Sequence, residues 1–180
     1  VDSSAAAALV TLAQSQGVKV IAYDRPIPDA PADYYVSFDN VAVGTTIGEG
    51  LVKCLNDAGI TEGPVAYLNG SPTDNNATLF KEGYATALEA AGFTPTADQA
   101  VPDWDNTKAG TIFEQMLTSA NGDFNGVAAA NDGLGGAAIS VLEKNADSAT
   151  SRNSRPTSQG NGMSCKAVQP QCRPSMFSST

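Results

Sequence analysis

The order of elements along the 180-residue chain predicts an α/β fold built on doubly wound parallel sheets. Short apolar runs, typical of buried strands, alternate with longer stretches of helical periodicity. A short polar loop joins each run to the next helix, as repeated βα units require. Polar or aromatic side chains gather at these junctions, which is the sheet edge where open α/β folds bind small ligands.

The first third of the chain predicts a helix, two strands and a second helix. Ser3 and Ser4 can cap a first helix, which Gly17 ends. The run VKVIAY (18–23) predicts a buried strand, and YYVSF (34–38) predicts a short alternating strand. Asp39 or Asn40 then caps a helix that Gly59 ends. Three glycines inside it lower its intrinsic stability and permit close packing: Gly44, Gly48 and Gly50.

The rest of the chain repeats the strand, loop and helix order. Residues 65–68 form an apolar run, and Gly70, Ser71 and Pro72 break the chain after it. Asp74 or Asn75 can cap the following helix. Three further elements are expected: a strand and loop over 93–105, a helix over 107–120 and a strand over 124–130, with a last helix after Asp132.

Composition excludes several function classes. A net charge of −9 argues against a nucleic-acid partner, because phosphates need a basic face. Histidine is absent, which removes the commonest general base and metal ligand, and no phosphate loop or nucleophile–base pair is present. We therefore expect no catalysis and no cofactor. No apolar run approaches the length of a membrane span.

Four strand-to-helix junctions carry side chains suited to a polyhydroxylated ligand. Carboxylates and amides present acceptors and donors at fixed angles, and an aromatic ring can stack on the apolar face of a sugar. These side chains are Asp24 and Arg25 at the first junction, Asp74, Asn75 and Asn76 at the second, Trp104 at the third, and Asn131 and Asp132 at the fourth. Each alone has a plainer interpretation, as a helix cap and turn, a local ion pair or a packing tryptophan. Together they favour a binding edge.

The sequence resembles the type I periplasmic sugar-binding proteins of ABC transporters, with the greatest similarity to the D-xylose-binding group. The motifs are VIAYDR (20–25), YVSFDN (35–40), LNGSPTDNNATLFKEGY (68–84), WD (104–105) and AAANDG (128–133). The resemblance implies two doubly wound lobes joined by a hinge, with the sugar in the cleft between them. It implies sugar contacts from Asp24, Arg25, Asp74, Asn76, Trp104 and Asn131, with Asp132 adjacent.

The resemblance also implies a division of the chain. Residues 1–38 are expected to be part of an incomplete first lobe, whose opening strand and helix would precede Val1, and residues 39–147 the second lobe. Residues 148–180 depart from the family and have a different composition, with four basic residues and no acid.

The family's role implies a monomeric binding protein in the periplasm or on the cell surface, a monosaccharide ligand and a membrane permease as partner. The alternative is the sugar-sensing domain of a transcriptional repressor, which shares this fold.

Three arrangements are open for the three cysteines. If QCRPSMF (171–177) keeps the family register, a Cys54–Cys172 bridge ties the end of the chain to its body. Otherwise Cys165 pairs with Cys172, or no bridge forms and Cys54 is a small buried apolar residue.

Overall fold

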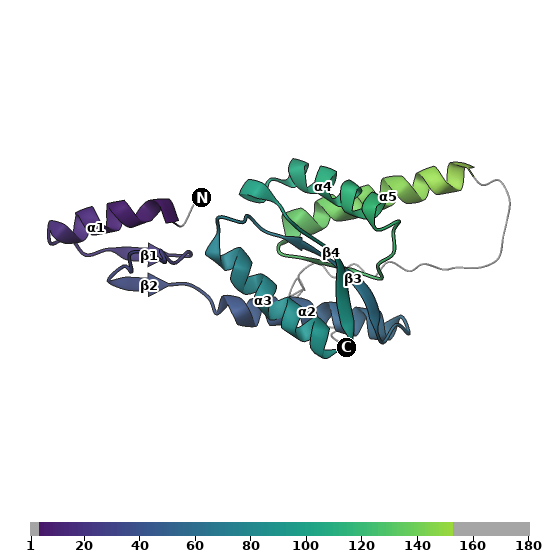
Figure 1. Ribbon diagram of the computed structural model, residues 1–180, viewed down its shortest axis with the longest axis horizontal. Helices are drawn as coiled ribbons and strands as arrows, with labels where there is room; N and C mark the ends of the chain where they lie inside the picture. The colour runs from purple at the N-terminus through teal and green to yellow at the C-terminus, as the bar shows by residue number, and fades with distance from the viewer. Residues whose placement is uncertain (1–3, 153–180) are drawn as a thin grey trace, which may run out of the picture.

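A computed structural model describes residues 4–152 of the chain, and the side chains of residues 5–145. Helices and strands alternate through most of this span, as Figure 1 shows. In order, the elements are η1 (Ser4–Ala6), α1 (Ala7–Ser15), β1 (Ile21–Tyr23), β2 (Tyr34–Val36), α2 (Asn40–Asp57), β3 (Gly63–Asn69), α3 (Asn75–Ala90), β4 (Phe93–Ala100), η2 (Pro102–Trp104), α4 (Asn106–Ser119), β5 (Val127–Ala129) and α5 (Asp132–Arg152).

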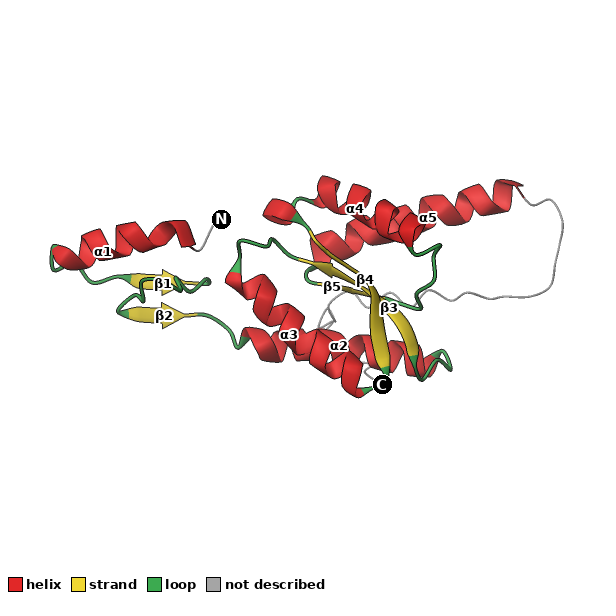
Figure 2. Ribbon diagram, in the orientation of Figure 1, coloured by secondary structure: helices red, strands yellow, loops and turns green. Residues whose placement is uncertain are grey.

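The strands form two separate parallel sheets. In the first, β1 pairs with β2, with Ile21 opposite Tyr34. In the second, the order is β4-β3-β5 and both pairings are parallel. We call the part from η1 to β2 the N-terminal unit and the part from α2 to α5 the C-terminal unit. The two units lie side by side in Figure 2, with the residues after β2 crossing between them. The predicted α/β fold with parallel sheets is confirmed.

Helices cover both faces of the sheet in the C-terminal unit. Val65 and Tyr67 of β3 face α2 and α3, whereas Ala66 and Leu68 face α4 and α5. All four of these side chains are buried, at 1% exposure or less. A strand of a parallel sheet that is covered on both faces has a nearly continuous run of apolar residues. This is why β3 could be predicted from the sequence.

Close packing of α2 against α3 depends on glycine. A Cβ atom added at Gly44 would lie 2.2 Å from the backbone oxygen of Phe80, and one at Gly83 would lie 2.3 Å from that of Val41. Gly48 is similarly close to Tyr84, but Gly50 has nothing within 4 Å. The predicted close packing is therefore confirmed for Gly44 and Gly48, and it is wrong for Gly50.

The strands of the N-terminal unit differ from the prediction. The expected buried strand over 18–23 is reduced to β1, where Ile21 is 63% and Tyr23 81% exposed. Likewise β2 is shorter than residues 34–38, and all three of its residues are exposed. The physical reason is coverage. Among the described residues, α1 is the helix beside this two-stranded sheet (Figure 1), and Val10 of α1 and Ala22 of β1 are buried.

Helix caps follow the prediction except at the first helix. Asp39 caps α2 by accepting from the amide of Ala42 at 2.9 Å, and Asp74 caps α3. The predicted serine cap is wrong for Ser4, because Ser4 lies inside η1 and Ala6 occupies the N-cap position without a side-chain bond. Gly17 ends α1 as expected, with a left-handed φ of 75°.

Other boundaries shift by a few residues. The strand expected over 124–130 is limited to β5, and Trp104 lies in η2 rather than in an open loop. The last helix predicted after Asp132 is α5, which runs from Asp132 to Arg152. Cys54 is half-buried on α2, whereas Cys165 and Cys172 lie outside the described residues, so the cysteine pairing stays a prediction. In the span described, no helix is both long and apolar enough to cross a membrane.

Candidate functional site

Two strand ends from different sheets meet near the start of α3. Asp24 and Arg25 directly follow β1, and Asp74 ends the loop that joins β3 to α3. In Figure 1 the end of β1 points toward the first turn of α3. Three of the four predicted junctions contribute to the group of side chains that meets here, which we call the polar cluster: Asp24, Arg25, Asn40, Asp74, Asn76 and Trp104.

The Asp74 carboxylate is the centre of this cluster. Its Oδ1 accepts from the backbone amide of Asn76 at 3.0 Å, the bond that caps α3. Its Oδ2 accepts from Arg25 Nε at 2.5 Å and from the Trp104 indole Nε1 at 3.0 Å. The side chain of Asp74 has no exposed surface, whereas that of Arg25 is 31% exposed. Burial of a carboxylate is costly unless it is paired and hydrogen-bonded, and these three donors meet that requirement.

Amide groups form the second half of the cluster. Asn76 Nδ2 donates to the backbone oxygen of Asp24 at 3.0 Å, and its Oδ1 accepts from Asn40 Nδ2 at 3.2 Å. Asn40 and Asn76 are both buried. Ser37 Oγ donates to the same Asp24 oxygen at 2.7 Å. These bonds link the N-terminal unit to the first turns of α2 and α3, so the arrangement depends on both units.

The backbone around Trp104 is constrained. Asp103 and Trp104 have left-handed φ angles of 61° and 58°, and the amide of Asp103 donates to Ser71 Oγ at 3.2 Å. The indole lies directly on Gly70, where an added Cβ would be 2.1 Å from its ring. The Phe80 ring meets it edge-on at a centroid distance of 6.5 Å. Trp104 is therefore half-buried and held on several sides, not free in a loop.

The charges beside Trp104 are acidic. A hydrogen bond from Lys108 lowers the pKa of Asp103, and backbone amides of Lys108 and Thr107 lower the pKa of Asp105. Both carboxylates thus stay ionised well into acid. A negative rim beside the polar cluster suits hydroxyl donors better than anions.

The fourth junction is not bonded to the polar cluster. Asn131 Oδ1 accepts from the amide of Leu134 at 2.9 Å, which is a helix-start interaction for α5. Asp132 is exposed and lines a hollow between α4 and α5. Asn131 does follow β5, the neighbour of β3, and so stands at the same sheet edge. Asn75, in the first turn of α3, is half-buried and also outside the bonded set.

Sequence reasoning missed three polar residues at this site. Asn40 was considered only as a possible cap, but Asp39 caps the helix and Asn40 instead bonds Asn76. Ser37 and Ser71 support Asp24 and Asp103. A signal was present for Ser37 and Asn40, because both lie in the motif YVSFDN (35–40) that carries part of the family resemblance.

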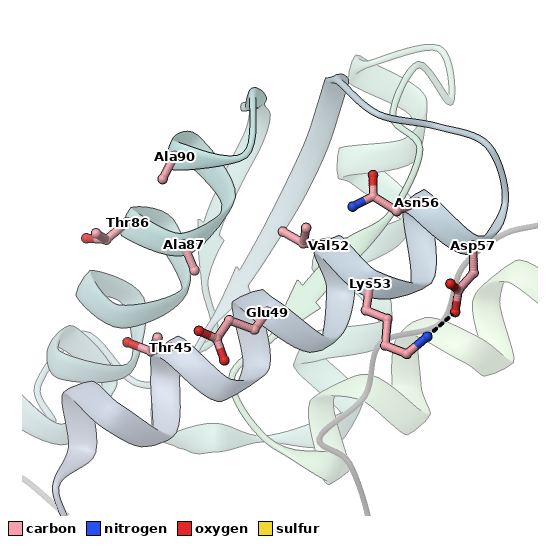
Figure 3. A pocket seen from close by; sticks show the side chains of 9 residues that line it. All are labelled: Thr45, Glu49, Val52, Lys53, Asn56, Asp57, Thr86, Ala87 and Ala90. Carbon is pink, nitrogen blue, oxygen red and sulfur yellow. Dashed lines mark hydrogen bonds and ion pairs between the residues drawn. The ribbon is translucent and has the colours of Figure 1, made fainter.

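Other features of the described surface do not extend the site. A groove of about 520 Å³ lies between α2 and α3, lined partly by Glu49, Val52 and Lys53 (Figure 3). None of the predicted site residues lines it. No group of histidine, cysteine or carboxylate side chains suited to a metal ion occurs in the part of the chain that the structure describes.

Comparison with known sequences identifies relatives. The family described as periplasmic binding protein domain matches residues 1–154. The D-xylose-binding periplasmic protein of Escherichia coli (strain K12) is 38% identical over 138 residues, covering 74% of this chain and 40% of the relative. The protein of the same name from Haemophilus influenzae is 39% identical over 138 residues, with the same coverage. The chain thus spans about 40% of the length of these two relatives.

Solved structures show the same architecture. An ABC transporter solute-binding protein from Clostridium phytofermentans, solved with β-D-glucose, aligns with a TM-score of 0.70 and 25% identity, covering 79% of this chain and 49% of that one. The Caulobacter myo-inositol binding protein aligns with a TM-score of 0.71 and 25% identity, covering 79% and 48%.

These findings agree with the fold. The relatives are named for what they bind and not for a reaction, so the prediction of a binding protein rather than an enzyme is confirmed. The parallel sheets are those of the type I fold, as the sequence resemblance implied. Because the match extends over residues 1–154 and so covers all of the described residues, this chain belongs to the periplasmic binding protein domain family.

Proposed function

We propose that the protein binds a monosaccharide, specifically a xylose-like pentose, between its N-terminal and C-terminal units. The single observation that carries this proposal is the polar cluster, which joins donors and acceptors from both units at the carboxyl ends of β1 and β3. The two relatives named for D-xylose supply the sugar class. In this proposal residues 1–38 belong to a first lobe, residues 39–147 form the second, and residues 37–40 act as the hinge.

The chemistry of the cluster suits a sugar. Arg25 uses Nε for Asp74 and approaches Asp24 with Nη1 at 3.4 Å, which leaves other guanidinium N–H groups for hydroxyl oxygens. The carboxylate of Asp24, 46% exposed, can accept from hydroxyl donors. The Trp104 ring offers an apolar surface for the C–H face of the ring. Asn75, which lies between Asp74 and Asn76 in sequence, and Asn131 and Asp132 after β5 complete the proposed set at the same sheet edge.

We further propose the setting that the relatives suggest. The protein would act as a monomer in the periplasm and present its sugar-bound form to the permease of an ABC transporter, since the Clostridium phytofermentans protein is named as an ABC transporter solute-binding protein. Closure of two lobes about a hinge would be the signal that the permease reads. A sugar-sensing role is the alternative. A solved structure with this fold is the fructose-binding periplasmic domain of a hybrid two-component system. Its TM-score is 0.72 and its sequence identity is 20%, so it supports a shared fold alone.

Calorimetry tests the proposal directly. The full chain is titrated with D-xylose, D-ribose, L-arabinose and D-glucose, and we expect binding with the strongest affinity for a pentose. Arg25→Gln should weaken that affinity about tenfold or more, because a charged hydrogen-bond donor is lost. Lys53→Gln is the matched control, since Lys53 is an exposed base on α2 that pairs with the nearby Asp57 and lies outside the polar cluster.

The fluorescence of Trp104 gives a second test of the same proposal. It is the only tryptophan of the chain, so its emission reports this site alone. We expect the emission to change when the sugar binds and Trp104→Ala to weaken binding while the far-UV spectrum is retained. The absence of heat and of an emission change with all four sugars would refute the proposal.

A further inference from the structure

Asp74 differs from the other helix-capping aspartates of the chain. The carboxylates of Asp39 and Asp105 accept hydrogen bonds from backbone amides of the helices that they cap. For Asp39 the donor is the amide of Ala42, at 2.9 Å. Both of those side chains are bonded within one helix start. Asp74 caps α3 with Oδ1 in the same way, but its Oδ2 receives two side-chain donors from distant segments, Arg25 and Trp104. Capping therefore explains only one of its two oxygens.

The accessibility of these three side chains is also unequal. The Asp74 side chain has no exposed surface, but 31% of the Arg25 side chain is exposed. Trp104 is half-buried. A ligand that enters between the units would therefore meet the guanidinium and the indole, with the carboxylate behind them.

We propose that Asp74 is a positioning residue, which aims the Arg25 guanidinium and the Trp104 indole at the ligand and does not itself contact it. This inference rests on the proposed monosaccharide binding and assigns roles within that site. It replaces the direct sugar contact that the sequence resemblance implied for Asp74.

Geometry explains why one carboxylate can orient both groups. The guanidinium is planar, so the 2.5 Å bond from Nε to Asp74 and the 3.4 Å approach of Nη1 to Asp24 together restrict its plane. The indole is restricted at one edge by the 3.0 Å bond from Nε1 and below by Gly70. Groups held in their binding orientation before the ligand arrives lose less conformational entropy on binding.

The first arm of the test needs no sugar. Asp74→Ser retains a good N-cap residue for α3 but is too short to reach Arg25 and Trp104. We expect the emission of Trp104 in the sugar-free full chain to shift to longer wavelength and its quenching by acrylamide to rise, because the indole is released. Asp39→Ser makes the same exchange at the α2 cap and should leave both readings unchanged. Unchanged fluorescence in a folded Asp74→Ser protein would overturn the proposal.

The second arm uses D-xylose and calorimetry. We expect Asp74→Ser to weaken binding about tenfold or more, as the loss of a charged hydrogen bond would. In the Arg25→Gln variant, adding Asp74→Ser should weaken D-xylose binding little further, because a positioning residue acts through the group that it positions. Losses that multiply in the double variant would show a direct contact and reject the assignment.

The two arms separate this inference from the proposed function. If no variant and no parent protein binds D-xylose, the proposed function fails for that sugar, but the fluorescence arm still decides whether Asp74 holds Trp104. If Asp74→Ser does not fold, Asp74→Thr replaces it, since threonine also caps a helix start and is too short to reach the two donors. A released indole in Asp74→Thr supports the assignment, and a parent-like spectrum overturns it.

Discussion

The two units of this protein use the same local pattern, a β-branched apolar strand beside a helix, with opposite results. In the C-terminal unit, β3 is buried because α2 and α3 pack on one face of the sheet and α4 and α5 on the other. In the N-terminal unit, β1 exposes Ile21 and Tyr23, although its sequence is as apolar as that of β3. The comparison teaches that a strand's burial is decided by how many layers cover it and not by its own residues.

The units also differ in what joins their elements. The C-terminal unit has two large apolar clusters. In the N-terminal unit, Asp33 accepts hydrogen bonds from Lys19, Val20 and Gln14, which tie α1, the residues just before β1 and the loop before β2 together. Three pairs of variants and one single variant test how burial and local bonds act in the two units.

The largest difference is expected between Leu55→Ala and Ile21→Ala. Leu55 is fully buried in the apolar cluster beneath α2, so its truncation should lower the free energy of unfolding by about 2–5 kcal/mol. Ile21 is 63% exposed, and its truncation should change that free energy by no more than about 0.5 kcal/mol. Urea unfolding of the full chain measures both. An equal cost at Ile21 would mean that β1 is covered in solution, and gel filtration would then show whether a second molecule covers it.

Alanine substitutions at two glycines of α2 should have effects of opposite sign. Gly44→Ala should destabilise the protein by about 1–3 kcal/mol, because the new Cβ meets the backbone of Phe80 and forces α2 and α3 apart. Gly50→Ala faces open space and should stabilise the helix by about 0.5–1 kcal/mol. Thermal unfolding of the two variants beside the parent gives the signs. Equal signs would contradict the close packing of the two helices.

Two buried tyrosines should respond differently to loss of their hydroxyl groups. The Tyr84 hydroxyl donates to Asn69 Oδ1, so Tyr84→Phe should cost about 1–2 kcal/mol by leaving that acceptor unpaired. Burial raises the pKa of Tyr67 to about 12, and its hydroxyl has no hydrogen-bond partner among the described residues. Tyr67→Phe should therefore be about neutral or slightly stabilising. Denaturant unfolding measures the pair, and a larger cost at Tyr67 would reveal a partner such as a bound water.

The smallest effect concerns pH in the N-terminal unit. Hydrogen bonds from Lys19, Val20 and Gln14 lower the pKa of Asp33 from 3.8 to about 2. A lowered pKa in the folded state means that the stabilisation is complete above about pH 4 and is lost as the pH falls toward about 2. Asp33→Asn should thus speed amide exchange in residues 20–36 at neutral pH and have little effect near pH 2. Exchange in residues 63–69 is the internal control, and a matching change there would contradict a local role for Asp33.

The site shows the same division between local pattern and spatial arrangement. Asp24, Arg25, Asp74, Asn76 and Trp104 could be selected from sequence because polar residues at strand ends are visible one junction at a time. That Asn131 serves the start of α5, outside the bonded cluster, could not be seen, since Asn is equally suited to a cap and to a ligand contact. Asn40 was passed over for the same reason.

The sequence by itself determined the α/β fold, the order of its elements, the positions where α2 and α3 begin to within a residue, and the edge of the sheet where polar groups gather. Each follows from periodicity, helix-capping chemistry or strand direction, which act over a few residues. Only the tertiary structure decided that β1 is exposed and β3 buried, that Gly50 is open while Gly44 is crowded, and that Arg25 and Trp104 meet on one carboxylate. Those outcomes depend on contacts between segments far apart in the chain, and local patterns carry no information about which segments meet.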